Sequence, residues 1–157
     1  MKNISSEIKR EIPGDSDFSA NNWFTDQSLF IKASADKIWP WLAQMGNNRA
    51  GWYSYDWLDN FAKPSFEHID MSLQNIFKGQ KLMIGEISDF SKNQFITFKF
   101  GHIANYTLIL FEKDGSTELL TRIRCKGPKV LLNYTLGIGH FVMQKKQLME
   151  IKRRVEK

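Results

Sequence analysis

The sequence has very few of the residues that build disulfide frameworks and metal sites. Among its 157 residues there is one cysteine, Cys125, and the histidines number three. A single cysteine excludes an internal disulfide and a cysteine-rich metal site, and no histidine pair has the His-x-x-x-His spacing of zinc ligands. We therefore expect no metal and no other cofactor. The scarcity of cysteine also favours a reducing compartment, so the expected location is the cytoplasm.

Long apolar runs are absent as well. No window approaches the ~18 apolar residues of a membrane-spanning helix, and residues 1–10 lack the apolar core of a signal peptide. The chain has no Gly-x-Ser-x-Gly elbow and no phosphate-binding loop, and Gly137-Ile138-Gly139 lacks the third glycine of a dinucleotide motif. The sequence thus carries no common signature of a hydrolase or a nucleotide-binding enzyme.

The excess of positive charge lies at the C-terminal end of the sequence. The net charge is +5. The 15 basic and 15 acidic residues before position 129 cancel, whereas residues 129–157 hold seven basic and two acidic residues. Such a cluster either complements a helix C-terminus or contacts an anionic surface through Lys152, Arg153 and Arg154. Aromatic and basic residues lie in different segments, which argues against the interleaved surface of a single-strand nucleic-acid binder.

The length is typical of one domain. Residues 1–22 are polar and contain the turn signal Pro13-Gly14-Asp15, so we expect a lead-in segment ahead of a single domain over residues 23–157. A strand is expected over 25–33. A helix should follow it, with Ser34 as N-cap, Pro40 in its interior and a stop at Gly46.

The rest of the chain is predicted to form a short helix, an antiparallel meander and a long helix. Ser54 should cap a helix over 55–61, and residues 64–77 look irregular. The two-residue period then predicts antiparallel strands with one apolar face, so that the sheet is covered on one side only. The expected strands span 81–87, 94–100, 105–112 and 117–126.

A long helix over 136–156 is expected to cover the apolar face of the sheet. Lys145 falls in the middle of its apolar stripe, so it either faces a wet cavity or packs its stem while its head reaches solvent. The stripe consists of Ile138, Phe141, Val142, Leu148, Met149 and Val155.

The richest segment is 39–57, which holds four of the five tryptophans and two tyrosines. Such a concentration of large side chains with polar tips predicts one wall of a core or of a ligand cavity. Arg49 could bind an oxygen of a ligand or form an ion pair with Asp56 or Asp59. The candidate ligand-binding residues are Trp41, Gln44, Arg49, Trp52, Tyr53, Tyr55, Trp57, Phe98, Phe100, Phe141 and Lys145.

The order of elements and the run Trp39-Pro-Trp-Leu-Ala-Gln-Met-Gly, followed by Arg49-Ala-Gly-Trp-Tyr-Ser-Tyr-Asp-Trp-Leu-Asp-Asn, resemble a known family. They are similar to a polyketide cyclase/dehydrase-like subgroup of the START/Bet v1-like (SRPBCC) superfamily. Ile12-Pro-Gly-Asp and the run that starts at Phe141-Val-Met-Gln extend the likeness over nearly the whole chain. Departures lie between residues 66 and 81, where Gln80 replaces an acidic residue and Asp70-Met-Ser replaces a His-Pro-Glu-like run.

The resemblance implies an α+β helix-grip fold, in which an antiparallel sheet wraps around a long C-terminal helix and two short helices follow the first strand. It implies a cavity for a small hydrophobic partner such as a lipid or polyketide. It does not imply catalysis, because fold does not fix function. Binding is the first hypothesis. The alternatives are a cyclase/dehydrase-type enzyme using proton transfer at Lys145, Tyr53, Tyr55 or Asp56, and an interaction module using the basic C-terminal helix.

Overall fold

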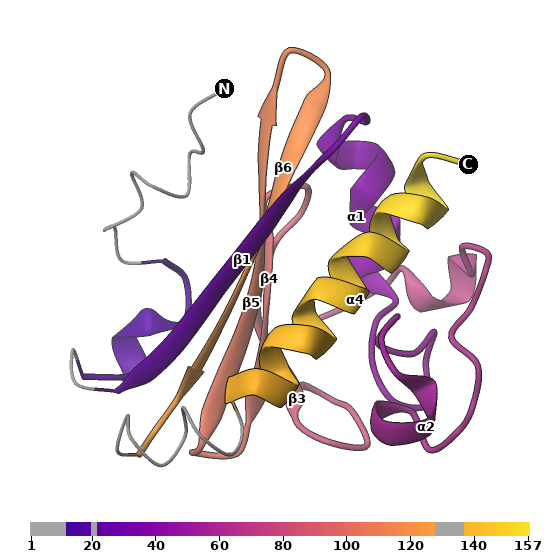
Figure 1. Ribbon diagram of the computed structural model, residues 1–157. Coiled ribbons are helices and arrows are strands. Elements are labelled where there is room, and N and C mark those ends of the chain that lie inside the picture. Colours follow the sequence, from indigo (N-terminus) through magenta and orange to yellow (C-terminus); the bar gives the residue numbers. More distant parts are fainter. Residues whose placement is uncertain (1–11, 20–21, 128–136) are drawn as a thin grey trace.

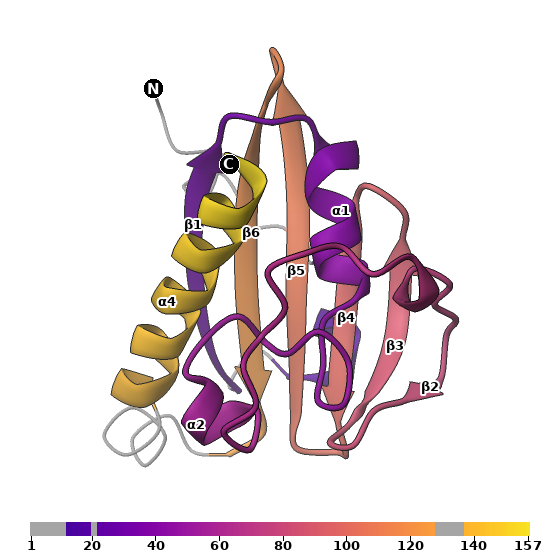
Figure 2. The same ribbon diagram turned by 90° about the vertical axis from the view of Figure 1, so that its right-hand side faces the viewer.

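The computed structural model describes residues 12–19, 22–127 and 137–157. Its central element is a six-stranded antiparallel sheet with the strand order β1-β6-β5-β4-β3-β2. Helices α1 and α4 lie on the same face of this sheet (Figures 1 and 2). The elements are η2 (Asp15–Asp17), β1 (Trp23–Ile31), α1 (Ala35–Ala43), α2 (Asp56–Asp59), η3 (Met71–Leu73), β2 (Gln80–Lys81), β3 (Glu86–Ser91), β4 (Phe95–Phe100), β5 (Ala104–Lys113), β6 (Ser116–Cys125) and α4 (Gly137–Val155).

The order of the strands confirms the predicted α+β helix-grip fold. Strands β2 to β6 form a meander, and β1 closes the far edge by pairing with β6 along its whole length, from Trp23 opposite Cys125 to Ile31 opposite Thr117. Helix α4 crosses the sheet face diagonally and packs chiefly on β1, while α1 packs on β5. The inner face of the sheet, α1 and α4 therefore enclose the space in which a core or a cavity can form.

The predicted strand over 81–87 is wrong, because the chain turns sharply inside it. Gly85 has a φ of 84°, and a Cβ there would lie 2.6 Å from the Lys99 carbonyl oxygen. Glycine permits both the left-handed backbone and this close approach. The chain consequently splits into β2 and β3, joined by a turn in which Leu82 N donates to Gly85 O. Residues 89–91, which lie between the expected strands 81–87 and 94–100, form the second half of β3.

Both short helices form, and Ser34 is the N-cap of α1 as predicted, whereas the predicted cap of α2 is wrong. Ser34 occupies the N-cap position of α1 without a side-chain hydrogen bond, and the free amide of Ala35 donates instead to the Glu112 carboxylate at 2.8 Å. Helix α2 is shorter than predicted, with Tyr55 at its N-cap. The Ser54 hydroxyl donates to the Met143 carbonyl in α4, so it ties two elements together rather than capping one.

Helix α4 has nearly the predicted bounds but a different buried face. Phe141, Val142 and Met149 are exposed, and so is Lys145, whose head therefore reaches solvent. The side chain of Ile138 lies outside the described residues. The buried positions of the helix are Gln144, Gln147, Leu148, Ile151 and Arg154. The predicted stripe is confirmed at Leu148 and at Val155, which packs against the core. It is wrong at Phe141, Val142 and Met149, because three polar side chains are buried on the adjacent face, each with hydrogen bonds to the surrounding protein.

The outer face of the sheet is also covered, contrary to the prediction of a one-sided sheet. Residues 12–17 lie across it, where the Thr107 hydroxyl donates to Pro13 O at 2.9 Å and Arg122 pairs with Asp15 at 2.7 Å. Ile12 packs there against Ile109 and Leu120 in a small second core. This part of the lead-in segment is therefore integrated into the fold.

The main core lies between the inner face of the sheet and the helices. Cys125 is buried there as a free thiol, on the apolar face that its alternation predicted, and burial raises its pKa. Its low exposure and raised pKa fit an inert core position. Within the three described ranges, no helix combines the length and apolar character needed to cross a bilayer.

Candidate ligand cavity

A cavity of about 330 Å³ lies between the sheet, the α1–α2 region and the N-terminal half of α4. This volume is at the lower end of the range of small-molecule sites, ~300–1,000 Å³. Its lining is mainly apolar and aromatic, with a few polar side chains. The lining residues are Asn47, Trp52, Ser54, Leu58, Asp59, Phe61, Ile84, Phe100, Tyr106, Ile123, His140, Met143, Gln144 and Gln147.

The aromatic wall of the cavity is built around Trp52. Its ring meets Phe98 edge-on at 5.1 Å and Phe100 at 6.0 Å, while its indole N–H donates to Asn47 Oδ1 at 2.9 Å. The preceding turn is closed by a bridge between Gly46 and Gly51. Gly51 has a φ of 88°, and a Cβ there would come within 2.3 Å of Ser65 Oγ, so only glycine fits. The glycines thus set the direction in which Trp52 faces the cavity.

A buried hydrogen-bonded chain joins three elements around the cavity. The Tyr106 hydroxyl on β5 donates to Gln147 Oε1 on α4, and Gln147 Nε2 donates to the Trp52 carbonyl at 2.7 Å. Burial raises the pKa of Tyr106, so its hydroxyl keeps its proton and acts as a donor. The chain fixes the distance between the sheet, the helix and the aromatic wall.

Gln144, which lines the cavity, has an unpaired buried donor. Its side chain is 5% exposed, and its Nε2 has no hydrogen-bond partner among the described residues. Its Oε1 accepts from Gln27 Nε2 at 3.3 Å, and the same Gln27 nitrogen donates to Phe141 O at 2.6 Å. The Phe141 carbonyl requires a donor, so it fixes the Gln27 amide and, through it, the orientation of Gln144. The free group is therefore an N–H.

Asp59 at the end of α2 presents an unused acceptor. Its Oδ1 is buried without a hydrogen-bond partner among the residues described, and it lines the same cavity. Burial, reinforced by the nearby charge of Asp56, raises the pKa of Asp59 to about 6. This carboxyl group therefore titrates close to neutral pH, as proton-transfer groups in apolar sites do.

His140, in the first turn of α4, is the third titratable side chain at the cavity together with Asp59 and Tyr106. Burial lowers its pKa. The imidazole is therefore neutral at pH 7 and above. Near neutral pH, the cavity thus has a negative or neutral lining and no fixed positive charge.

Apolar side chains surround the mouth of the cavity. Leu58, Phe61 and Ile84 line it and are 48% to 59% exposed. Phe61 and Ala62 both have left-handed backbone, with φ of 52° and 60°. Bulky residues adopt this conformation at a cost of about 1 kcal/mol or more and keep it only where their surroundings require it. The Ala62 amide supplies one such requirement by donating to Asp56 O at 2.8 Å.

The structure distributes the predicted site residues between the cavity, the core and the surface. Trp52 and Phe100 line the cavity. Phe98 is fully buried behind Trp52, and Trp41 packs edge-on against Tyr53 at 6.0 Å within the core. Tyr55, Trp57, Phe141 and Lys145 do not line it; Tyr55 lies near Lys146, and the other three are exposed.

Gln44 and Arg49 are used by the protein itself. Gln44 donates to the Tyr53 hydroxyl and accepts from Asp70 N, which anchors the loop that follows α2. Arg49 forms neither of the expected pairs with Asp56 and Asp59: it donates to Ala43 O at 2.8 Å and to Leu73 O at 2.7 Å. Its guanidinium thus joins the end of α1 to η3.

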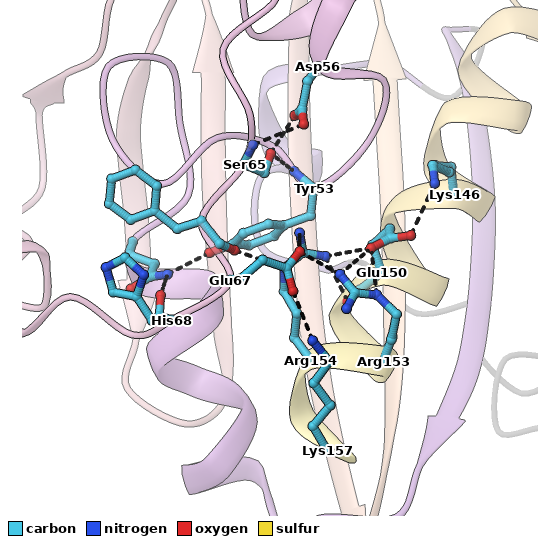
Figure 3. Close-up of polar contacts among 12 residues, drawn as sticks. Tyr53, Asp56, Ser65, Glu67, His68, Lys146, Glu150, Arg153, Arg154 and Lys157 are labelled. Atoms are coloured by element: carbon cyan, nitrogen blue, oxygen red, sulfur yellow. Dashed lines mark hydrogen bonds and ion pairs between the residues drawn. The ribbon is translucent and has the colours of Figure 1, made fainter.

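The basic C-terminal residues meet acidic partners. Figure 3 shows Glu67 at the centre of a cluster in which Arg154 binds it at 2.6 Å and Lys157 at 3.1 Å. Arg153 binds the same carboxylate, and Arg154 also lies over the Tyr53 ring at 4.8 Å. Lys152 donates to Phe30 O at 2.8 Å. The cluster therefore clamps the end of α4 to the loop at Glu67 and neutralises most of the local charge.

The sequence gives little or no signal for several cavity residues. It indicates Asp59 only as a possible partner of Arg49, and it does not single out Gln144 or Gln147. Gln144 and Gln147 lie three residues apart, on the buried face of the helix. Together with Lys145 and Lys146 they form a run of four polar residues, which a hydropathy pattern assigns to solvent. Tyr106 and Asn47 carry no motif, because their roles depend on contacts across the chain.

Solved structures confirm the fold. Protein SSP2350 from Staphylococcus saprophyticus is 12% identical, with 85% of this chain and 92% of that chain covered at a TM-score of 0.54. Protein CV1439 from Chromobacterium violaceum is 10% identical, with 85% and 97% covered at 0.52. Ms6760 from Mycobacterium smegmatis is 13% identical, with 83% and 88% covered at 0.51. No family model matches the sequence. No curated protein matches it either.

Proposed function

We propose that this chain binds a small hydrophobic molecule, such as a lipid or polyketide fragment, in the cavity between the sheet and α4. The observation that carries the proposal is the cavity of about 330 Å³ with its largely apolar lining. Apolar pockets with a few convergent polar groups are the usual form of small-molecule sites. The resemblance to the START/Bet v1-like superfamily, which stays a proposal, supports the same function.

A catalytic role by proton transfer is a second candidate, and one observation favours it. Asp59 lines an apolar cavity and has a pKa of about 6, close to the value that suits a general acid or base at neutral pH. The residues first considered for this role lie elsewhere: Lys145 is exposed, and Asp56 holds Ser65 through two hydrogen bonds. Any such chemistry in this cavity would therefore be assigned to Asp59.

The interaction-module hypothesis has less support. The three basic residues on which it rests, Lys152, Arg153 and Arg154, all have carboxylate or carbonyl partners within the chain. Exchanging those partners for an anionic surface would leave Glu67 and Glu150 beside that surface, which opposes the contact.

The binding proposal is tested by mass spectrometry of solvent extracts from freshly purified protein, together with native mass spectra of the intact chain. We expect a co-purifying apolar molecule at near-stoichiometric level. Ile123→Phe adds volume to the cavity lining and should remove that molecule without unfolding the protein. The matched control is Ile109→Phe, the same change on the outer face of the sheet. An empty wild-type protein whose melting temperature no apolar compound changes would refute the proposal.

A further inference from the structure

The two unused polar atoms of the cavity indicate which kind of apolar molecule it takes. Buried polar side-chain atoms almost always have partners, because an unpaired one loses its hydrogen bonds to water without a replacement. Gln144 Nε2 and Asp59 Oδ1 have none among the described residues, although both belong to side chains that line the cavity. One is a donor and the other an acceptor, and they come from two neighbouring elements, α4 and α2. A bound molecule that supplies an acceptor and a donor would satisfy both.

The charge of the cavity lining further restricts the chemical class of the ligand. The described lining residues include no lysine and no arginine, and their one carboxyl group is that of Asp59. An anionic head group would meet an ionised Asp59 without any cation to offset it. Two unit charges ~6 Å apart at an effective dielectric constant of ~20 repel by ~3 kcal/mol, which amounts to more than a hundredfold in affinity.

We infer that the cavity takes uncharged hydroxylated ring compounds, with a hydroxyl oxygen accepting from Gln144 Nε2 and a hydroxyl hydrogen donated to Asp59 Oδ1. A hydroxyl group is the simplest group that offers both an acceptor and a donor. A plain hydrocarbon would leave both protein atoms unpaired, and a carboxylate would be repelled. This inference rests on the proposed binding function and adds the polar chemistry of the ligand to it.

The test uses three probes with one ring system and different polar groups: 2-naphthol, 2-methylnaphthalene and 2-naphthoate. Dissociation constants are measured by equilibrium dialysis with the full chain at pH 7.5. We expect 2-naphthol to bind roughly three to ten times more tightly than 2-methylnaphthalene, the effect of one buried hydrogen bond. We expect 2-naphthoate to bind most weakly.

Two substitutions separate the hydrogen bond from the charge. Gln144→Met keeps the length of the side chain and removes the donor, so it should abolish the preference for 2-naphthol while 2-methylnaphthalene binds as well as before or better. Gln94→Met makes the same change at an exposed turn and should alter nothing. Asp59→Asn removes the negative charge and should strengthen 2-naphthoate binding by roughly tenfold or more.

The outcomes are distinguishable. If wild-type protein binds the two neutral probes equally, or if Gln144→Met leaves the preference for 2-naphthol intact, the inference is overturned while the binding function stands. Tightest binding of 2-naphthoate by the wild type would overturn it too. If none of the three probes binds, the inference and the proposed function fail together. Retained 2-methylnaphthalene binding by Gln144→Met shows that the variant is folded with its cavity intact.

Discussion

Tyr106→Phe gives the sharpest test of how the cavity is held open. The substitution removes only the hydroxyl that donates to Gln147 Oε1. Gln147 is 5% exposed, so its oxygen would remain buried without a donor, which costs ~1–3 kcal/mol. For a chain of 157 residues, at about 2–4 °C per kcal/mol, the melting temperature should fall by roughly 2–12 °C.

The same variant should perturb the cavity and not the sheet. Gln147 Nε2 also holds the Trp52 carbonyl at 2.7 Å, so we expect the loss of one bond to weaken the other. Urea denaturation of Tyr106→Phe, Gln147→Met and the double variant measures this coupling, which should be ~0.5–3 kcal/mol. Tyr55→Phe, at a half-buried position outside the cavity, is the control. Additive effects of the two changes would refute the chain of hydrogen bonds as a unit.

Three further predictions concern single carboxylates. Asp59 holds its proton more tightly in the folded protein, with a pKa of about 6 against 3.8, so the free energy of unfolding should fall as pH rises from 4 to 6. In urea denaturation at pH 7.5, Asp59→Asn should be ~1–2 kcal/mol more stable than wild type, a value discounted for the partial exposure of the carboxyl group. Below pH 4 the two proteins should be equally stable. Asp15→Asn leaves the buried Arg122 with one carboxylate partner, Asp26. The substitution should lower the free energy of unfolding by ~2–4 kcal/mol in the same assay. A decrease below ~0.5 kcal/mol would contradict the anchoring of the lead-in segment. The pKa of Glu67 is lowered to about 2, chiefly by its hydrogen bond from Arg153, so its contribution to folding stability is present above pH 4.5 and lost as pH falls towards 2. Glu67→Gln should lower the free energy of unfolding by ~0.5–1 kcal/mol at pH 7. An acid denaturation curve unchanged by this substitution would disprove the clamp.

The sequence predicted the architecture well because it depends on strong local signals. The alternation in β4, β5 and β6 and the length of α4 gave those elements within a residue or two. The division of the 81–87 strand was missed because Gly85 has its positive φ for a tertiary reason, the close approach of the Lys99 carbonyl. Apolar alternation alone carries no information about that contact.

The cavity was harder to predict than the fold. The sequence offered Trp52 and Phe100 separately as candidate ligand-binding residues, and both line the cavity, with their rings 6.0 Å apart. The helical face that completes it was misassigned, because the sequence favours apolar residues for burial and α4 buries Gln144, Gln147 and Arg154 instead. Each of these makes a hydrogen bond to a distant segment, and a buried polar residue can be recognised only when its partner is known.

The unequal fastening of α4 has a mechanical consequence. Its C-terminal half is held by Glu67 through Arg153, Arg154 and Lys157, whereas its N-terminal half borders the cavity from His140 to Gln147. The N-terminal half is held by neutral hydrogen bonds, from Gln27 to Phe141 O and from Ser54 to Met143 O, and not by ion pairs. Entry of a bulky guest should therefore displace the N-terminal half more than the ion-paired end, and amide hydrogen exchange should be faster in the turn at His140 than near Arg154.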